Sequence, residues 1–357
     1  MKKLFSVLTI IVLAVVLAAC DRRPVLKVFL PLEYIGEDFL KEFNKNSEYR
    51  VEIIEFESNE DMLSKYNTST YDLIIPSDYA LEELVEKDAL LDIDWDRINT
   101  FKQADIDESL MAAINMLKDD EVSFDLLKYG VPYFWGSFGI IYDTTKVSKS
   151  VLEEKGWNIF EDGKDQMLYD SSRDMVMVGL KQHYAKNNID RSVNNPTNDD
   201  LAAVQTWLTS LKGSKTQIAT EEVYDLMLDP TRVDLALAYS GDAAYLIDEN
   251  PKLDYFVPVN QGTNIFIDAI VIPKTSSQID FAYDFINFLL AKENSYANSL
   301  EIAFTSPRAD VIEMVLENED YQESAYKILF NEKDELFRYN PTLSNEVTNI
   351  WQRVLAA

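Results

Sequence analysis

The chain has 357 residues, and its 62 acidic side chains against 33 basic ones give a formal net charge of −29. A surface of this sign repels nucleic acid and attracts cations. The length and a hydrophobic content of 47% predict two folded lobes and exclude a disordered tail. With one cysteine and one histidine, a zinc site built from those ligands is excluded, and a Ser–His–Asp or Cys–His centre would depend on His183, which we expect to be structural.

The N-terminal segment predicts export. Residues 1–19 combine two lysines with an uncharged apolar run, which is typical of a secretory signal peptide and too short for a comfortable membrane span. The motif Leu17-Ala18-Ala19-Cys20 resembles the lipobox of bacterial lipoproteins, in which the cysteine is acylated, for example with palmitate. We therefore expect residues 20–24 to be a lipidated cysteine and a short tether. An ordinary signal peptide or a free N-terminal anchor is the alternative.

After the tether, strands and helices alternate. The hydrophobic pattern predicts a parallel sheet with right-handed crossovers, in which ligands bind beyond the carboxyl ends of the strands. The predicted strands are Val25–Leu30, Arg50–Phe56 and Tyr71–Ile75, and the helices between them are Glu37–Phe43 and Asn59–Tyr66.

A second set of elements follows, and from Phe281 onward the chain is expected to be mainly helical. The predicted strands are Phe138–Tyr142, Met167–Tyr169, Leu235–Tyr239, Leu253–Val257 and Ile265–Ile272, and the predicted helices are Arg173–Lys186 and Leu201–Leu211.

We expect the middle block to interrupt the first lobe, and the strand at 265–272 to return to it. Lobe 1 is then residues 25–133 plus about 266–312, and lobe 2 is residues 134–265 plus about 313–357. Two lobes joined by more than one crossing would enclose a hinged cleft.

Polar residues follow the buried strand at 71–75. Ser77 is placed to cap a helix beginning at Asp78, where an acid suits the helix dipole. Alternatively, Ser77 and Tyr79 face a ligand at the edge of the sheet.

Two later strand ends carry acids with the same two interpretations. Ser171 and Asp174 fit a capping box, but Asp174 could instead meet an ammonium group. Tyr239 and Asp242 follow the strand at 235–239, where Asp242 either supports a helix start or faces a ligand.

Asp268 is harder to explain as a structural residue. It lies inside an apolar strand, on the same face as Phe266. A carboxylate there is costly unless it is paired or hydrogen-bonded. A cation held between the aromatic face and the acid would satisfy it, and a linear diamine or polyamine needs both kinds of contact.

The order and spacing of these motifs resemble the spermidine/putrescine-binding proteins that deliver polyamines to ABC importers, from about Val25 to Ala357. The motifs that carry the resemblance are Glu33-Tyr34, Glu57-Ser58-Asn59-Glu60, Tyr71-Asp72-Leu73-Ile74-Ile75-Pro76-Ser77-Asp78-Tyr79, Val131-Pro132-Tyr133-Phe134-Trp135-Gly136, Ser171-Ser172-Arg173-Asp174, Tyr239-Ser240-Gly241-Asp242, Asp268, Ile272-Pro273 and Ile286-Asn287-Phe288-Leu289-Leu290.

The resemblance implies an α/β, type II periplasmic-binding fold with a polyamine clamped in the hinged cleft between two lobes. Three departures from the family pattern put recognition of a third ammonium group in doubt: Pro31 replaces a Trp, Ser171 an acid and Phe337 a Gln. The ligand-binding positions that it implies are Glu33, Tyr34, Ser77, Tyr79, Asp174, Tyr239, Asp242, Phe266, Asp268 and Phe304.

We therefore expect an exported, lipid-anchored, monomeric substrate-binding protein of a polyamine ABC importer. It would bind putrescine, spermidine or a related amine, contact permease subunits, perform no chemistry and use no cofactor, metal or nucleic acid. The alternatives are a binding protein for another organic cation or small solute and, from a different class, a carboxylate-based secreted hydrolase. An adhesin or structural lipoprotein would have no need of the acid–aromatic pairing at Phe266 and Asp268.

Overall fold

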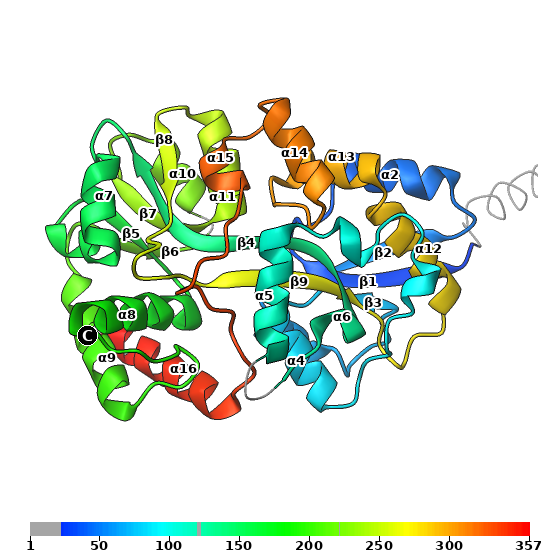
Figure 1. The fold of residues 1–357 in the computed structure, drawn as a ribbon, viewed down its shortest axis with the longest axis horizontal. Coiled ribbons are helices and arrows are strands. Elements are labelled where there is room, and N and C mark those ends of the chain that lie inside the picture. Colours follow the sequence, from blue (N-terminus) through cyan, green and yellow to red (C-terminus); the bar gives the residue numbers. More distant parts are fainter. Residues whose placement is uncertain (1–22, 120–122, 221) are drawn as a thin grey trace, which may run out of the picture.

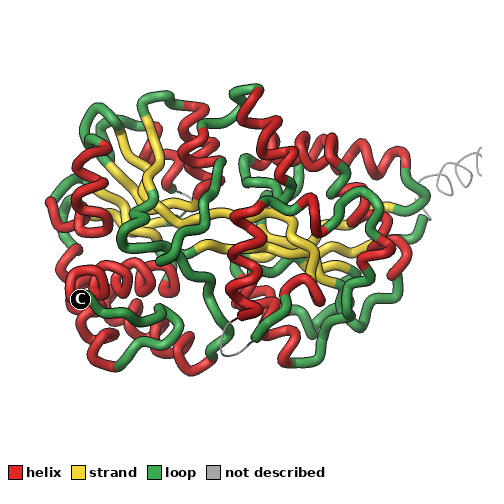
Figure 2. Tube along the Cα trace, viewed as in Figure 1, coloured by secondary structure: helices red, strands yellow, loops and turns green. Residues whose placement is uncertain are grey.

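The computed structural model describes residues 23–119, 123–220 and 222–357. The predicted signal peptide and the predicted acylation site at Cys20 lie outside the described residues. Among the helices that are described, none is long and apolar enough to cross a membrane. Strands run through the middle of an elongated molecule, with helices packed on both sides of them (Figure 2).

The strands form one sheet, and all except β6 overlap strands that the sequence predicts. They are β1 (Val25–Pro31), β2 (Arg50–Phe56), β3 (Leu73–Ile74), β4 (Gly130–Asp143), β5 (Gln166–Tyr169), β6 (Thr216–Ala219), β7 (Leu235–Tyr239), β8 (Leu253–Phe256) and β9 (Ile265–Val271). Their order is β2-β1-β3-β9-β4-β7-β5-β6, with β8 paired to β4.

The first part of the sheet confirms the predicted β-α-β-α-β series. β1 pairs in parallel with β2 on one side and with β3 on the other. Helix α2 (Glu37–Asn46) connects β1 to β2, and α3 (Asn59–Lys65) connects β2 to β3. The carboxyl ends of β1 and β3 therefore lie at the same edge of the sheet, where sheets of this kind bind ligands.

β4 joins the two ends of the molecule. Its first half pairs antiparallel with β9, and its second half pairs antiparallel with β7 and β8. The two strands β4 and β9 run side by side through the centre (Figure 1). The sequence predicts only residues 138–142 of β4, because the strand is buried along its whole length and shows no alternation. β9 also pairs with β3, through Ile74 and Val271, which confirms that this strand returns to the first part of the sheet.

The second part of the sheet contains its own parallel group, since β5 pairs in parallel with both β6 and β7. The α-helices flanking the sheet are α4 (Asp78–Glu86), α5 (Glu108–Asp119), α6 (Leu126–Tyr129), α7 (Lys149–Lys155), α8 (Ser172–Asn187), α9 (Asn198–Leu211), α10 (Val223–Leu228), α11 (Ser240–Glu249), α12 (Ile279–Leu289), α13 (Lys292–Ile302), α14 (Ala309–Glu317), α15 (Glu323–Tyr326) and α16 (Pro341–Ala356). Short 3-10 turns are η1 (Trp95–Arg97), η2 (Gln103–Asp105) and η3 (Gly156–Asp162).

The buried apolar side chains divide the molecule into two packing regions. One cluster joins β1–β3 and the first half of β4 with β9, α12 and α14. Two further clusters lie around the second half of β4, one with α8, α9 and α16 and one with α10 and α11. Val315 and Leu336 belong to the first cluster, whereas Phe337 belongs to the second region. Between Val315 and Leu336, α15 contacts α11 and β8 of the second region, and Ala325 belongs to one of its clusters. We therefore propose that the chain enters the second lobe soon after the expected 313, contacts both regions from there on, and makes its last crossing near Phe337.

Candidate functional site

A cavity of about 340 Å³ lies between the two packing regions. Larger hollows of 790 to 880 Å³ lie elsewhere in the described chain, but they do not include the buried acids and aromatic rings of the cleft. Eight of the ten predicted site residues line the cavity, and they come from both regions. These eight are Tyr34, Ser77, Tyr79, Asp174, Tyr239, Phe266, Asp268 and Phe304.

Asp268 is a buried acid of the cavity, with 4% of its surface exposed. Its Oδ2 accepts a hydrogen bond from the Tyr34 hydroxyl at 2.5 Å, and its Oδ1 accepts one from the Ser77 hydroxyl at 2.6 Å. Burial raises the pKa of Asp268 to about 6, although both hydroxyl bonds oppose the rise. These donors are neutral, so the buried carboxylate keeps its capacity to attract a cation.

Ser77 serves Asp268 and does not cap α4, because its side chain accepts no hydrogen bond from that helix. Asn59 holds it in place: the Asn59 side chain donates to the Ser77 hydroxyl at 2.8 Å and accepts from its backbone N–H at 3.0 Å. Ser58 caps α3 by accepting from the Asp61 N–H, which places Asn59 in the first turn of that helix. The capping alternative for Ser77 is therefore wrong.

Asp78 is also buried, but both of its carboxylate oxygens already accept hydrogen bonds from backbone N–H groups. It accepts hydrogen bonds from the N–H groups of Tyr79 at 2.7 Å and Ile267 at 3.2 Å. Burial raises its pKa, and the nearby charge of Asp268 adds to the rise. Asp78 thus fastens the start of α4 to β9 and keeps Tyr79 and Asp268 in register.

Asp174 lies in the first turn of α8 on the other side of the cavity, 3% exposed. Its Oδ2 accepts a hydrogen bond from the Tyr239 hydroxyl at 3.0 Å, while its buried Oδ1 has no partner among the described residues. Burial raises its pKa. Ser171 caps α8 by accepting from the Asp174 N–H, so the cap leaves the carboxylate available to the cleft.

Aromatic rings separate the two acids. Phe266 makes edge contacts with Tyr239 and Phe304, with ring centres 5.2 and 6.0 Å apart. Two glycines allow these rings to approach closely. A Cβ atom at Gly136 would lie 2.7 Å from Cζ of Phe266, and one at Gly241 would lie 2.4 Å from Cδ2 of Phe304. A substitution at either glycine would therefore push an aromatic wall out of place.

The structure places Glu33 and Asp242 outside the cavity lining. Glu33 is exposed, and Asp242 accepts a hydrogen bond from the Tyr224 hydroxyl at 2.7 Å. Burial raises the pKa of Tyr224, and the charges of Asp242 and, more weakly, Glu33 raise it further. Their predicted role in ligand binding stays a prediction.

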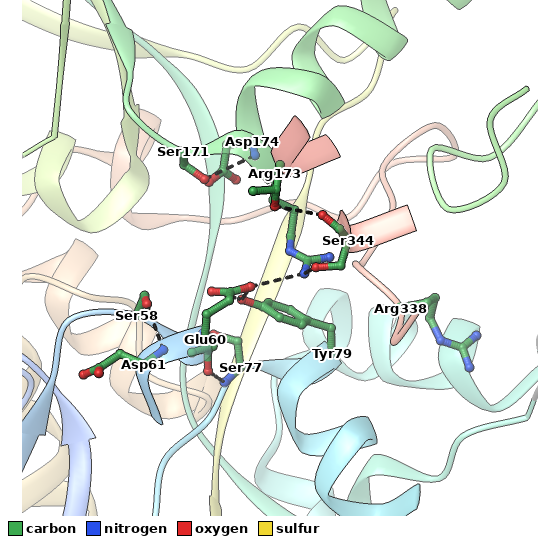
Figure 3. Close-up of polar contacts among 12 residues, drawn as sticks. Ser58, Glu60, Asp61, Ser77, Tyr79, Ser171, Arg173, Asp174, Arg338 and Ser344 are labelled. Atoms are coloured by element: carbon green, nitrogen blue, oxygen red, sulfur yellow. Dashed lines mark hydrogen bonds and ion pairs between the residues drawn. The ribbon is translucent and has the colours of Figure 1, made fainter. Parts of the chain in front are cut away.

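The sequence reasoning missed Arg173 as a cleft residue. Its guanidinium carbon lies 3.9 Å from the ring centre of Tyr79, and its Nη2 lies 3.3 Å from Oε1 of Glu60 (Figure 3). The Tyr79 hydroxyl also donates to Glu60, at 3.2 Å. Both charged residues stand in motifs that the family resemblance singles out, but only the fold shows that they meet.

The arrangement has the chemistry of a binding site for an organic cation. Carboxylates at opposite sides can accept from ammonium groups, and the rings between them can cover an apolar chain. Within residues 23–119, 123–220 and 222–357, no group of three or more His, Cys, Asp or Glu side chains is placed to hold a metal ion. Two α/β lobes around such a cleft define a solute-binding protein.

Comparison with known proteins places the chain in a family. It belongs to the bacterial extracellular solute-binding proteins, whose pattern matches residues 38–327. The putrescine/cadaverine-binding protein of Pseudomonas aeruginosa is 26% identical over 333 residues, covering 88% of this chain and 87% of the relative. The putrescine-binding periplasmic protein SpuD of Pseudomonas aeruginosa is 26% identical over 294 residues, covering 77% and 76%.

A solved structure confirms the predicted fold. The spermidine/putrescine ABC transporter substrate-binding protein PotD of Streptococcus pneumoniae superposes with a TM-score of 0.75. It is 25% identical, and the match covers 93% of this chain and 99% of that one. The relatives named here are thus polyamine-binding proteins or components of polyamine ABC transporters.

Proposed function

We propose that this protein is the substrate-binding component of a polyamine ABC importer and binds putrescine, spermidine or a closely related amine between its lobes. The observation that carries the proposal is the pair of buried carboxylates, Asp268 and Asp174, on opposite sides of an aromatic-lined cavity. The names of the relatives support the same class of ligand.

Each acid offers a different contact to an ammonium group. At Asp268, the ligand competes with or joins two neutral hydroxyl donors, and a charge-assisted bond is about twice as strong as a neutral one. At Asp174, the Oδ1 oxygen needs a donor to offset its burial. Phe266 and Tyr239 then cover the methylene chain of the ligand. Where a ring also lies against an ammonium group, the cation–ring contact contributes about 0.5–2 kcal/mol.

Binding drives closure only if the closed form binds better than the open one. A linear amine meets this condition here, because Asp268 lies in β9, which packs in the first region, and Asp174 lies in α8, which packs in the second. We propose that the permease recognises the closed monomer and that the protein itself performs no chemistry. The alternatives are a hydrolase and a binding protein for another organic cation, and calorimetry with a set of ligands distinguishes them.

The proposal includes export and a lipid anchor on Cys20, with residues 20–24 as the tether. Arg23 marks where such a tether would join the fold: its Nη1 donates to the carbonyl oxygens of Asn44 at 2.5 Å and Ser47 at 2.8 Å. The described chain therefore begins against the first lobe, so a tether would attach the protein to the membrane through this lobe. Mass spectrometry of the N-terminal peptide from the exported protein tests the acylation, and an unmodified Cys20 would contradict it.

Calorimetry on the chain beginning at Asp21, which contains every described residue, tests the ligand. Putrescine, cadaverine and spermidine should release or absorb heat with saturable one-to-one binding. Butylamine should bind far more weakly, because it reaches only one acid, and the uncharged 1,4-butanediol should not bind. Thiamine and choline are included as other organic cations. Binding of either with no response to any polyamine would replace the proposed ligand class, and turnover of glycosides would favour the hydrolase.

A further inference from the structure

Arg173 is a charged side chain of the cleft that the proposed ligand contacts do not use. It extends from the first turn of α8, in the second lobe, toward two residues of the first lobe (Figure 3). Its Nη2 lies 3.3 Å from Oε1 of Glu60 in α3, and its guanidinium stacks on the ring of Tyr79 in α4. The same guanidinium therefore contacts both a carboxylate and an aromatic face across the cleft.

Arg173 is also held from its own side. Its Nη2 donates to the Ser344 hydroxyl at 3.3 Å, and the guanidinium carbon lies 5.4 Å from the ring centre of Phe337. Ser344 lies in α16, and Phe337 packs in the core of the second lobe. The Arg173 side chain is 17% exposed. The terminal Nη2 therefore contacts Ser344 of its own lobe as well as Glu60, and a guanidinium that is also stacked on a ring has little freedom left to lose.

We propose that Arg173 is a positioning residue that stabilises the closed arrangement of the two lobes. It is a resident cation, and it joins the lobes with the same chemistry that a ligand ammonium group uses: a carboxylate from one side and an aromatic face from the other. The contacts with Glu60 and Tyr79 cross between lobes, so they exist only when the cleft is closed. This inference rests on the proposed function, because closure serves the capture of a ligand.

A closure residue has a recognisable energetic signature. The apparent dissociation constant is the intrinsic one divided by the fraction of molecules in the binding-competent state. Loss of Arg173 lowers that fraction, so every ligand loses affinity by the same factor. A residue that touches the ligand would instead change the preference among amines of different length.

The test uses Arg173→Met, which keeps an unbranched apolar stem and removes the guanidinium with its charge, in the chain beginning at Asp21. Glu60→Gln removes the partner charge, and the double variant Arg173→Met/Glu60→Gln measures their coupling. The matched control is Lys41→Met. Lys41 forms an exposed ion pair with Glu37, and both residues lie on α2 within one lobe. Circular dichroism and thermal unfolding establish that each variant is folded.

Calorimetry with putrescine, cadaverine and spermidine should show a loss of about five- to tenfold in affinity for Arg173→Met, equal for all three ligands. Glu60→Gln should lose less, because Tyr79 remains, and the double variant should lose less than the product of the two single effects. Arg173→Lys should recover part of the loss, since it restores the charge without the planar stacking group. Lys41→Met should match the wild type.

Small-angle X-ray scattering of the ligand-free proteins gives an independent readout. Arg173→Met should have a larger radius of gyration than the wild type without ligand, and the two should agree at saturating ligand. An unchanged ligand-free radius, or a loss of affinity confined to the longest amine, would overturn the proposal. If the wild type binds no polyamine, the proposed function fails, while the scattering comparison still decides whether Arg173 holds the lobes together.

Discussion

The hydroxyl of Tyr34 lies 2.5 Å from Oδ2 of Asp268, although 234 positions separate the two residues along the chain. The other carboxylate oxygen meets the hydroxyl of Ser77, 191 positions away. The segments that follow β1 and β3 thus converge on one buried carboxylate in the middle of β9. The two hydrogen bonds fix the orientation of the Asp268 carboxylate before a ligand binds. Because both donors are neutral hydroxyls, the charge of the carboxylate remains uncompensated.

Asp268→Asn should weaken polyamine binding by about 2–5 kcal/mol, which is roughly 30-fold or more, because the ammonium loses its buried charged partner. Calorimetry with putrescine measures the loss. The control is Asp38→Asn, which removes a side chain that is 92% exposed in α2. Equal affinities in the two variants would show that Asp268 does not bind the ligand.

The same substitution should stabilise the ligand-free protein at pH 7. The pKa of Asp268 rises from its ordinary value of 3.8 to about 6 in the fold, so the folded chain prefers the protonated acid. A rise of about two units corresponds to at most about 3 kcal/mol of unfavourable free energy when the group is ionised. Urea unfolding should show Asp268→Asn gaining about 1–3 kcal/mol at pH 7 and losing this advantage below pH 4. A destabilised variant at pH 7 would contradict the expectation.

Polyamine affinity should fall as the pH decreases. Ammonium binding requires an ionised Asp268, and in the free cleft this acid takes up a proton as the pH falls through about 6. Burial raises the pKa of Asp174 in the same direction. Affinity should therefore be nearly constant above pH 7 and decrease by up to about tenfold per pH unit below 6. Calorimetry in buffers with different ionisation enthalpies should detect proton release on binding near pH 6. Constant affinity from pH 5 to 8 would exclude this linkage.

Gly241→Ala should lower the affinity about tenfold without unfolding the protein. The added Cβ atom would overlap Cδ2 of Phe304, and the ring must turn away from Tyr34 and Phe266. Gly213→Ala is the control, since a Cβ atom at Gly213 has nothing within 4 Å. Calorimetry and near-ultraviolet circular dichroism give the readout, and identical behaviour of the two variants would refute the role of Gly241.

Glu82→Gln should lower the free energy of unfolding by about 3 kcal/mol. Glu82 in α4 pairs through both carboxylate oxygens with Arg338, near the last crossing between lobes, and these side chains are 9% and 10% exposed. The substitution removes the charge of the carboxylate that binds this buried guanidinium through two hydrogen bonds. Urea unfolding measures the effect against Glu37→Gln, whose side chain is 84% exposed. A loss no larger than that of the control would contradict the prediction.

Local patterns predict much of the fold and most of the cavity lining. Alternation and capping signals locate β1, β2 and β7, because these elements depend on neighbouring residues. They miss most of β4, since a strand buried on both faces has no period. They also leave Ser77 undecided between a cap and a site residue, because that choice depends on Asp268 in a distant strand.

By itself, the sequence determined that the chain is strongly acidic, alternates strands with helices and carries an acid–aromatic pair at Phe266 and Asp268. These features are local or compositional. Only the tertiary structure decided which charges meet: Arg173 lies against Glu60 and Tyr79, while Glu33 and Asp242 stay outside the cavity lining. Because 62 acidic residues are available to 33 basic ones, each basic residue has many possible ion-pair partners. Which of them it meets depends on the surfaces that the fold brings together, and the composition does not determine this.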